Sequence, residues 1–317
     1  MKYLEHINQL IKIKVSEADN LVIFGQNVSA GSCLSGLTRN LKVKENSMII
    51  NTPNCENTLC GIGFGLMLNK VSSIFFMKQQ DFLLLGIDHL VNTYNFIRRE
   101  NPSASFTIMF IVVDQGYQGL QSSLNNLGDF CSIARIPGFA ITNKVDADEI
   151  IGAHLISPGF RMIGISQRLF NEELSDLPLI HCNEDKTLFQ YFEGKDATIV
   201  CFNLSFSYGL ELHQQLKDKN LNASLFSVNA VTPIKWEEII RDVKQTKKIV
   251  VIDDSKSMNL SCDNFLAHTL DECELKSKII IKRELLEDWL WPNSDKLNLD
   301  YAEIINKLKQ TTHQNEP

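Results

Sequence analysis

The run Phe106-Thr-Ile-Met-Phe-Ile-Val-Val113 constrains the fold of this chain more than any other feature of the sequence. It is far shorter than the ~20 apolar residues that a helix needs to cross a bilayer. A short run that is apolar at almost every position is typical of a strand covered on both faces, as in parallel sheets. The run therefore predicts the central strand of an α/β sheet.

Helical and strand patterns alternate along the rest of the chain. We expect the other strands at 21–24, 48–50, 73–76, 161–165, 197–202, 223–228 and 248–252. We expect helices at 3–15, 35–41, 58–68, 82–97, 147–155, 208–217, 235–243, 263–269 and 301–308. Strands that alternate with helices of this length imply right-handed βαβ crossovers and mostly parallel sheets.

A polar and irregular stretch at 166–195 interrupts the alternation, and we interpret it as a linker with room for a short strand at its middle. The parts on either side have the size of ordinary domains. The sequence thus predicts an α/β protein with two doubly wound domains, at 1–165 and 196–317, joined by a linker at 166–195.

The charge balance excludes two classes of partner. The chain has 31 Lys and Arg against 38 Asp and Glu, a net charge of -7, so we expect no nucleic-acid surface and no anionic membrane surface. No apolar run is long enough to span a membrane, and the first residues carry no hydrophobic signal core. We therefore expect a cytoplasmic protein.

The eight Cys and seven His predict no metal site, because they are dispersed and form no short-spaced ligand pairs. Gly61-Ile-Gly-Phe-Gly65 resembles part of a dinucleotide fingerprint, but the preceding strand ends too far upstream. We favour close helix packing through Gly61 and Gly65, which share a helix face. On the residue pattern alone, Glu56 before this helix is a solvated or helix-capping carboxylate.

The segment from Asn51 to Gly65 also carries a family resemblance, because it reads T-P-x-x-E, four further residues, then G-x-x-x-G. This pattern resembles the thiamine diphosphate enzymes of the transketolase group, and most closely the beta subunit of the decarboxylating component of 2-oxoacid dehydrogenases. Other segments resemble the same family in order and spacing: 3–9, 24–28, 37–41, 81–92, 136–138, 146–150, 231–236 and 250–254.

The resemblance implies a pyrimidine-binding domain at 1–165 and a transketolase C-terminal domain at 196–317. The family's magnesium-binding Gly-Asp-Gly…Asn motif is absent from this sequence. The resemblance therefore implies that thiamine diphosphate is shared with an alpha-type subunit, which would hold the diphosphate and the magnesium. It implies a heterotetramer, or at least a homodimer, in which the glycine-rich helix serves subunit packing.

Two site residues follow from the resemblance. Glu56 falls where the family places the carboxylate that bonds the aminopyrimidine ring and promotes formation of the nucleophilic ylid. Phe82 falls at the aromatic position beside that ring, and its alternative is a core residue at the start of a helix.

The sequence departs from the family pattern at several positions. Asn125 stands where the dehydrogenase beta subunits carry a His that faces the substrate and the lipoyl group, and an amide is no acid or base near neutral pH. Gln26 and Asn27 replace a Glu-Asp turn, and Leu85 replaces a common Glu, whereas Asp88 matches. These changes put lipoyl-linked oxidative decarboxylation in question but leave ylid formation intact.

Three functions stay open at this point. The first is a beta-type subunit of a thiamine diphosphate enzyme acting on a 2-oxoacid, active only with its alpha-type partner. The second is the C-terminal subunit of a split transketolase or carboligase of sugar or specialised metabolism. The third is a non-catalytic scaffold or regulatory subunit, against which the retained Glu56 argues.

Overall fold

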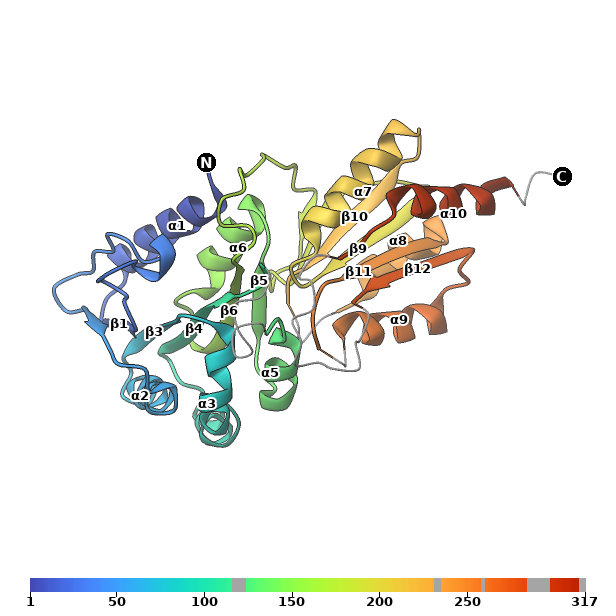
Figure 1. The fold of residues 1–317 in the computed structure, drawn as a ribbon. Coiled ribbons are helices and arrows are strands. Elements are labelled where there is room, and N and C mark those ends of the chain that lie inside the picture. Colours follow the sequence, from blue (N-terminus) through green and yellow to red (C-terminus); the bar gives the residue numbers. More distant parts are fainter. Residues whose placement is uncertain (116–123, 231–234, 258–259, 284–296, 314–317) are drawn as a thin grey trace.

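The structure is a computed structural model, and it describes residues 1–115, 124–230, 235–257, 260–283 and 297–313. Two six-stranded sheets lie side by side, each covered by helices on both faces (Figure 1). The predicted α/β architecture with two mostly parallel sheets is confirmed. The first part of the resemblance segment 231–236, Val231 to Ile234, lies outside the described residues.

The first sheet is entirely parallel, with the strand order β2-β1-β3-β4-β6-β5. Its strands are β1 Leu21–Gly25, β2 Met48–Asn51, β3 Ser72–Met77, β4 Ser105–Val112, β5 Gly138–Ile141 and β6 Gly159–Ser166. As the sequence predicted, β4 is central and all of its residues are buried.

Helices cover the first sheet on both faces (Figure 1). α1 (Tyr3–Glu17) and α6 (Lys144–His154) pack together on one face. The other face carries α2 (Glu56–Leu68), α3 (Leu83–Asp88) and α5 (Leu127–Ala134). The expected helix at 82–97 is a run of short helical pieces: a 3-10 turn η2 (Gln80–Phe82), α3, a π-helical turn (His89–Thr93) and α4 (Tyr94–Ile97).

The second sheet has the order β12-β11-β9-β10-β8-β7. Its strands are β7 His181–Cys182, β8 Leu188–Phe192, β9 Ala197–Phe202, β10 Ala223–Val228, β11 Lys248–Asp253 and β12 Ser277–Lys282. Its helices are α7 Phe206–Asp218, α8 Glu237–Thr246, α9 Ser261–Glu272 and α10 Tyr301–His313. β8 runs antiparallel to β10, and β7 antiparallel to β8, whereas the other strands are parallel.

Several elements differ from the sequence-based expectations. Both β7 and β8 come from the stretch 166–195, so this stretch extends the second sheet as well as joining the two units. The expected helix at 35–41 is a single 3-10 turn at Leu34–Gly36, because Cys33, Leu34 and Ser35 adopt positive φ angles that an α-helix cannot contain. The strands β5 and β12 and the helix α5 were not predicted.

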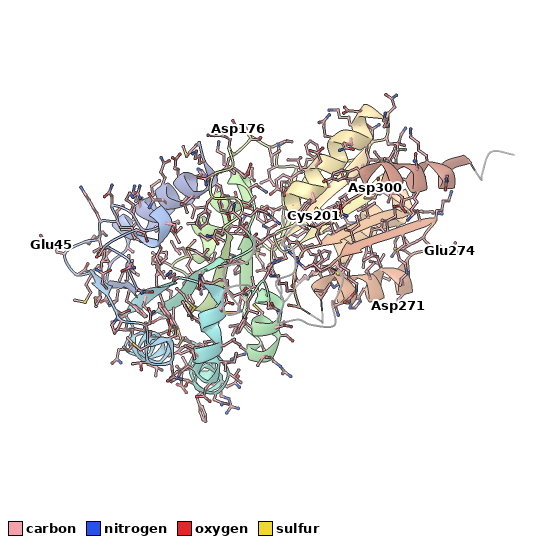
Figure 2. The ribbon with its side chains drawn as sticks, viewed as in Figure 1. Glu45, Asp176, Cys201, Asp271, Glu274 and Asp300 are labelled. Atoms are coloured by element: carbon pink, nitrogen blue, oxygen red, sulfur yellow. The ribbon has the colours of Figure 1, made fainter. Side chains whose placement is uncertain are left out.

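A continuous apolar core joins the two sheets. One cluster of buried side chains includes Ile111 and Ile165 of the first sheet together with Ile199 and Ile252 of the second. Acidic side chains such as Glu45 and Asp271 lie at the periphery, whereas Cys201 lies inside (Figure 2). Among the described residues, no helix is both long and apolar enough to cross a bilayer.

Candidate functional site

The carboxyl edge of the first sheet brings the predicted site residues together. In open α/β sheets, ligands bind where the strands end and the chain turns toward a helix. Gln26 directly follows β1, Thr52 directly follows β2, and η2 with Phe82 follows β3. Glu56 opens α2, the helix after β2. Because β2, β1 and β3 are neighbours in the sheet, these four segments share one edge.

Glu56 is the first residue of α2, whose N-cap is Cys55, rather than a residue of the preceding loop. Only 6% of Glu56 is exposed. Within the described residues its carboxylate has no hydrogen-bond or ion-pair partner, so it caps no helix amide there. The amino end of α2 is the positive end of the helix dipole, which favours a negative charge at this position. Burial and the nearby charge of Glu56 together raise the pKa of the Cys60 thiol to about 12.

Three buried polar atoms at this edge lack a partner in the described part of the chain: Gln26 Oε1, Thr52 Oγ1 and Gln80 Nε2. Burying a polar group without a hydrogen bond costs about 1–3 kcal/mol. Such groups therefore point to a ligand with hydrogen-bonding atoms. Gln26 Oε1 can accept a hydrogen bond, Gln80 Nε2 can donate one, and the Thr52 hydroxyl can do either.

Phe82 ends the turn η2, and its ring is half-buried against the apolar cluster that contains Leu83 and Phe110. The turn is held from outside: the amide of Leu124 donates to Asp81 Oδ1 at 3.2 Å, and the amide of Asn126 donates to Gln80 Oε1 at 3.1 Å. Phe82 is therefore partly a core residue, as the alternative prediction required. The rest of its side chain is exposed at the carboxyl edge of the sheet.

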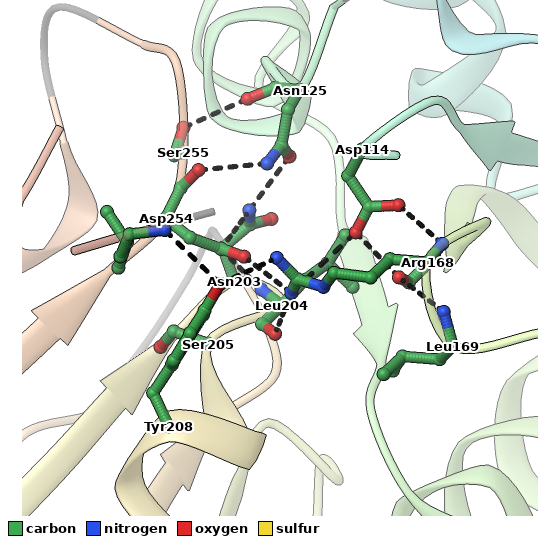
Figure 3. Close-up of polar contacts among 12 residues, drawn as sticks. Asp114, Asn125, Arg168, Leu169, Asn203, Leu204, Ser205, Tyr208, Asp254 and Ser255 are labelled. Atoms are coloured by element: carbon green, nitrogen blue, oxygen red, sulfur yellow. Dashed lines mark hydrogen bonds and ion pairs between the residues drawn. The ribbon is translucent and has the colours of Figure 1, made fainter. Parts of the chain in front are cut away.

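Asn125 lies between these two anchoring amides, and its side chain turns away from the edge toward the second sheet (Figure 3). It is fully buried. Its Nδ2 donates to the carbonyl of Asp254 at 2.9 Å, and its Oδ1 accepts from Asn203 Nδ2 at 2.8 Å. The residue at the expected His position is therefore part of the contact between the two sheets.

A buried charge cluster adjoins Asn125 (Figure 3). Arg168 Nη2 lies 3.1 Å from Asp254 Oδ2 and 3.8 Å from Asp114 Oδ2, and both carboxylates are fully buried. Burial raises the pKa of Asp114 despite the opposing charge of Arg168. Burial alone would lower the pKa of Arg168, but the charges of Asp254 and Asp114 hold it above its usual value. Sequence analysis missed this cluster, because its members follow strands far apart in the chain.

The glycine-rich helix α2 approaches the sheet through Gly63. A Cβ on Gly63 would lie 2.2 Å from the ring of Phe106, so α2 approaches β4 at this point. A Cβ on Gly61 would meet only the His89 ring, at 3.1 Å, and a Cβ on Gly65 would meet no atom within 4 Å. The face that Gly61 and Gly65 share does not pack on the sheet, and its role in subunit packing stays a prediction.

That helix and its neighbours expose large apolar side chains. Ile62 and Leu68 of α2, Leu84 and Leu85 of α3, and Phe96 of α4 are all exposed. In the described ranges, no group of three or more His, Cys, Asp or Glu side chains is placed to hold a metal ion.

Comparisons with known proteins bear on this arrangement. A scan against protein-family models finds no match. The chain is 23% identical over 267 residues to "Pyruvate dehydrogenase E1 component subunit beta, mitochondrial" of Dictyostelium discoideum, with 78% of this chain and 72% of the relative covered. It is 20% identical over 294 residues to "2-oxoisovalerate dehydrogenase subunit beta" of Bacillus subtilis strain 168, with 89% and 88% covered. The chain is a distant homologue of these beta subunits.

A solved structure extends the comparison to the whole fold. "Split gene transketolase, inactive beta4 tetramer" superposes with a TM-score of 0.66 at 14% identity, and the match covers 97% of this chain and 96% of that chain. The resemblance read from residues 51–65 is thus confirmed as distant homology, and the transketolase-like beta fold is confirmed for the chain.

Proposed function

We propose that this chain is the beta-type subunit of a thiamine diphosphate-dependent enzyme that acts on a 2-oxoacid, and that it contributes Glu56 to the shared cofactor site. The observation that carries the proposal is Glu56 itself, a residue only 6% exposed whose carboxylate has no hydrogen-bond or ion-pair partner among the described residues, at the carboxyl edge of a parallel sheet. Its relatives are named as beta subunits of pyruvate and 2-oxoisovalerate dehydrogenases.

The residues at this edge fit the pyrimidine half of the cofactor. Glu56 would hold a hydrogen bond to a ring nitrogen, Phe82 would pack against the ring face, and Gln26, Thr52 and Gln80 have buried polar atoms free to bond the ring. When bound, thiamine diphosphate supplies a thiazolium carbon that becomes a nucleophile on losing a proton. The part of Glu56 is to keep the proton shared with the ring in place.

The proposal requires a partner chain. The diphosphate and magnesium would be held by an alpha-type subunit, since this sequence lacks the Gly-Asp-Gly…Asn motif. The exposed apolar side chains of α2, α3 and α4 suit a subunit contact next to Glu56, and a heterotetramer is the assembly we propose. We further propose that 1–165 acts as the pyrimidine-binding domain and 196–317 as the transketolase C-terminal domain.

One observation favours a second candidate function. The fully buried Asn125 binds the second sheet and offers no acid or base to a substrate. A split transketolase or carboligase would use the same cofactor chemistry without a lipoyl acceptor. Substrate profiling of the assembled enzyme separates the two: lipoyl-domain acylation supports the dehydrogenase, whereas ketose formation supports the alternative.

The decisive experiment is co-purification with the alpha-type chain, followed by calorimetry with thiamine diphosphate and magnesium. We expect binding in the mixture and in neither chain alone. A complex that assembles but binds no cofactor would overturn the proposal and leave a scaffold or regulatory subunit.

A further inference from the structure

We propose that Asn125 is a positioning residue that makes the placement of Phe82 depend on the placement of the second sheet. The inference rests on the proposed function only in treating the turn η2 as part of a cofactor site. Its structural part, a connection from the second sheet to η2 through residues 124–126, stands on contacts within this chain.

The connection begins in the second sheet. Asn203 follows β9 and Asp254 follows β11, the two strands at which the order of that sheet reverses direction. Asn203 Nδ2 bonds both Asn125 Oδ1 and Asp254 Oδ1 at 2.8 Å. Residues that follow two strands of the second sheet therefore hydrogen-bond both the oxygen and the nitrogen of the Asn125 side chain.

The backbone of the same segment is tied to the second sheet as well. The carbonyl of Asn125 accepts from the amide of Lys256 at 2.8 Å and from Ser255 Oγ at 3.2 Å. All these donors and acceptors belong to residues directly after β9 and β11. A shift of these strand ends would therefore move residue 125 with them.

The connection ends at η2. The amides on either side of Asn125, those of Leu124 and Asn126, donate to the side chains of Asp81 and Gln80. Residues 124–126 thus alternate, with the middle residue bound to the second sheet and the outer amides bound to the turn. Since Gln80 and Asp81 immediately precede Phe82, the bond pattern places one short turn between the second sheet and the aromatic ring.

Through this arrangement the second sheet influences where Phe82 lies, although we place none of its own residues against the cofactor ring. Each link is a hydrogen bond with at least one buried partner, and an unpaired buried partner is costly. These hydrogen bonds therefore form or break together with the contact between the second sheet and the first. In this chain an amide serves that purpose at position 125 because it donates and accepts at once, as both partners require.

The test uses Asn203→Gly, which removes a link without touching η2 or Asn125 itself. Asn203 has a φ of 58°, so glycine takes its backbone conformation without strain. The matched control is Asn229→Ala. Asn229 also joins the two sheets, since its Nδ2 donates to Ala140 O at 2.8 Å and to Asp146 Oδ2 at 2.6 Å, but within the described part of the chain it makes no hydrogen bond to 124–126 or η2.

Amide hydrogen exchange on the full chain reads the connection directly. We expect the amides of Phe82, Leu124 and Asn126 to exchange about tenfold faster in Asn203→Gly, and at the wild-type rate in Asn229→Ala. Unchanged exchange at these amides in Asn203→Gly, or equal acceleration in both variants, would overturn the inference. This result does not depend on any cofactor.

Calorimetry on the complex with the alpha-type chain then reads the effect on the site. We expect thiamine diphosphate to bind Asn203→Gly complexes about tenfold more weakly, and Asn229→Ala complexes with wild-type affinity. Equal affinity in the two complexes would reject the positioning role. If wild-type complexes bind no cofactor, the proposed function fails instead, and the exchange result still decides whether the connection exists.

Discussion

The guanidinium of Arg168, just after β6, lies 3.1 Å from a carboxylate oxygen of Asp254, just after β11. The carboxyl ends of the two sheets therefore meet at a buried ion pair (Figure 3). Arg168 also donates from Nη2 to the carbonyl of Leu204 and from Nη1 to Tyr208 Oη. Its five donors and planar shape suit this crowded junction better than a lysine would.

Replacing Arg168 by Met should destabilise the protein strongly. The variant leaves the carboxylates of Asp114 and Asp254 buried without their cation, and removing one member of a buried charge cluster costs about 3–5 kcal/mol. Urea unfolding followed by circular dichroism measures the loss. The control is Lys44→Met, which breaks an exposed pair with Asp19 and should leave the unfolding midpoint nearly unchanged. Equal effects of the two substitutions would show that Arg168 is not a buried anchor.

Asp253 should make stability depend on pH. Burial raises its pKa from 3.8 to about 6, even though the Ser255 amide donates to it. The folded protein therefore holds this proton more tightly than the unfolded chain. Its stabilising contribution is complete below pH ~4 and is lost as the pH rises through about 6.

Asp253→Asn should remove this loss, because the amide stays neutral. Relative to wild type, the variant should gain on the order of 3 kcal/mol of unfolding free energy between pH 4 and pH 7. Urea titrations at several pH values give the difference curve. A difference that is flat with pH would mean that Asp253 titrates alike in the folded and unfolded chain.

The sequence predicts those parts of the fold whose signal is local. The strand at 197–202 is buried throughout and has the bounds that its apolar run predicts. In contrast, β12 alternates between half-buried and exposed residues at the edge of its sheet, so its apolar run is short. β5 begins at Gly138 directly after Pro137, and such a pair reads as a turn. β8 lies in a polar segment and is recruited by pairing with β10.

The candidate site likewise has residues that a local motif predicts and contacts that only the tertiary packing creates. Glu56 and Phe82 were located by a short motif and its spacing, and the structure places both at one sheet edge. Asn125 was located by counting from Pro137, but its partners could not be inferred. They lie 78 and 129 residues away in sequence, and only the packing of one sheet on the other brings them together.

The glycines of α2 should respond to alanine in opposite ways. Gly63→Ala would place a Cβ 2.2 Å from the Phe106 ring, and overpacking of this kind costs about 1–3 kcal/mol. Gly65→Ala meets no atom within 4 Å and should stabilise the isolated chain by roughly 0.5–1 kcal/mol through helix propensity. Thermal unfolding of the chain alone measures both. Two variants with the same sign of change would contradict the packing of α2 on β4.

Glu56→Gln should abolish turnover of the assembled enzyme while leaving assembly intact. The amide keeps the size of the side chain but cannot hold the proton shared with the ring, and loss of such a group costs about 10²–10⁴-fold in rate. The measurement pairs activity with size-exclusion chromatography of the complex. Glu45→Gln is the matched control, since Glu45 is exposed at the periphery, before the amino end of β2, and should keep full activity (Figure 2). Wild-type-like turnover in Glu56→Gln would remove Glu56 from the site, and failed assembly would move its role from the cofactor to the subunit contact.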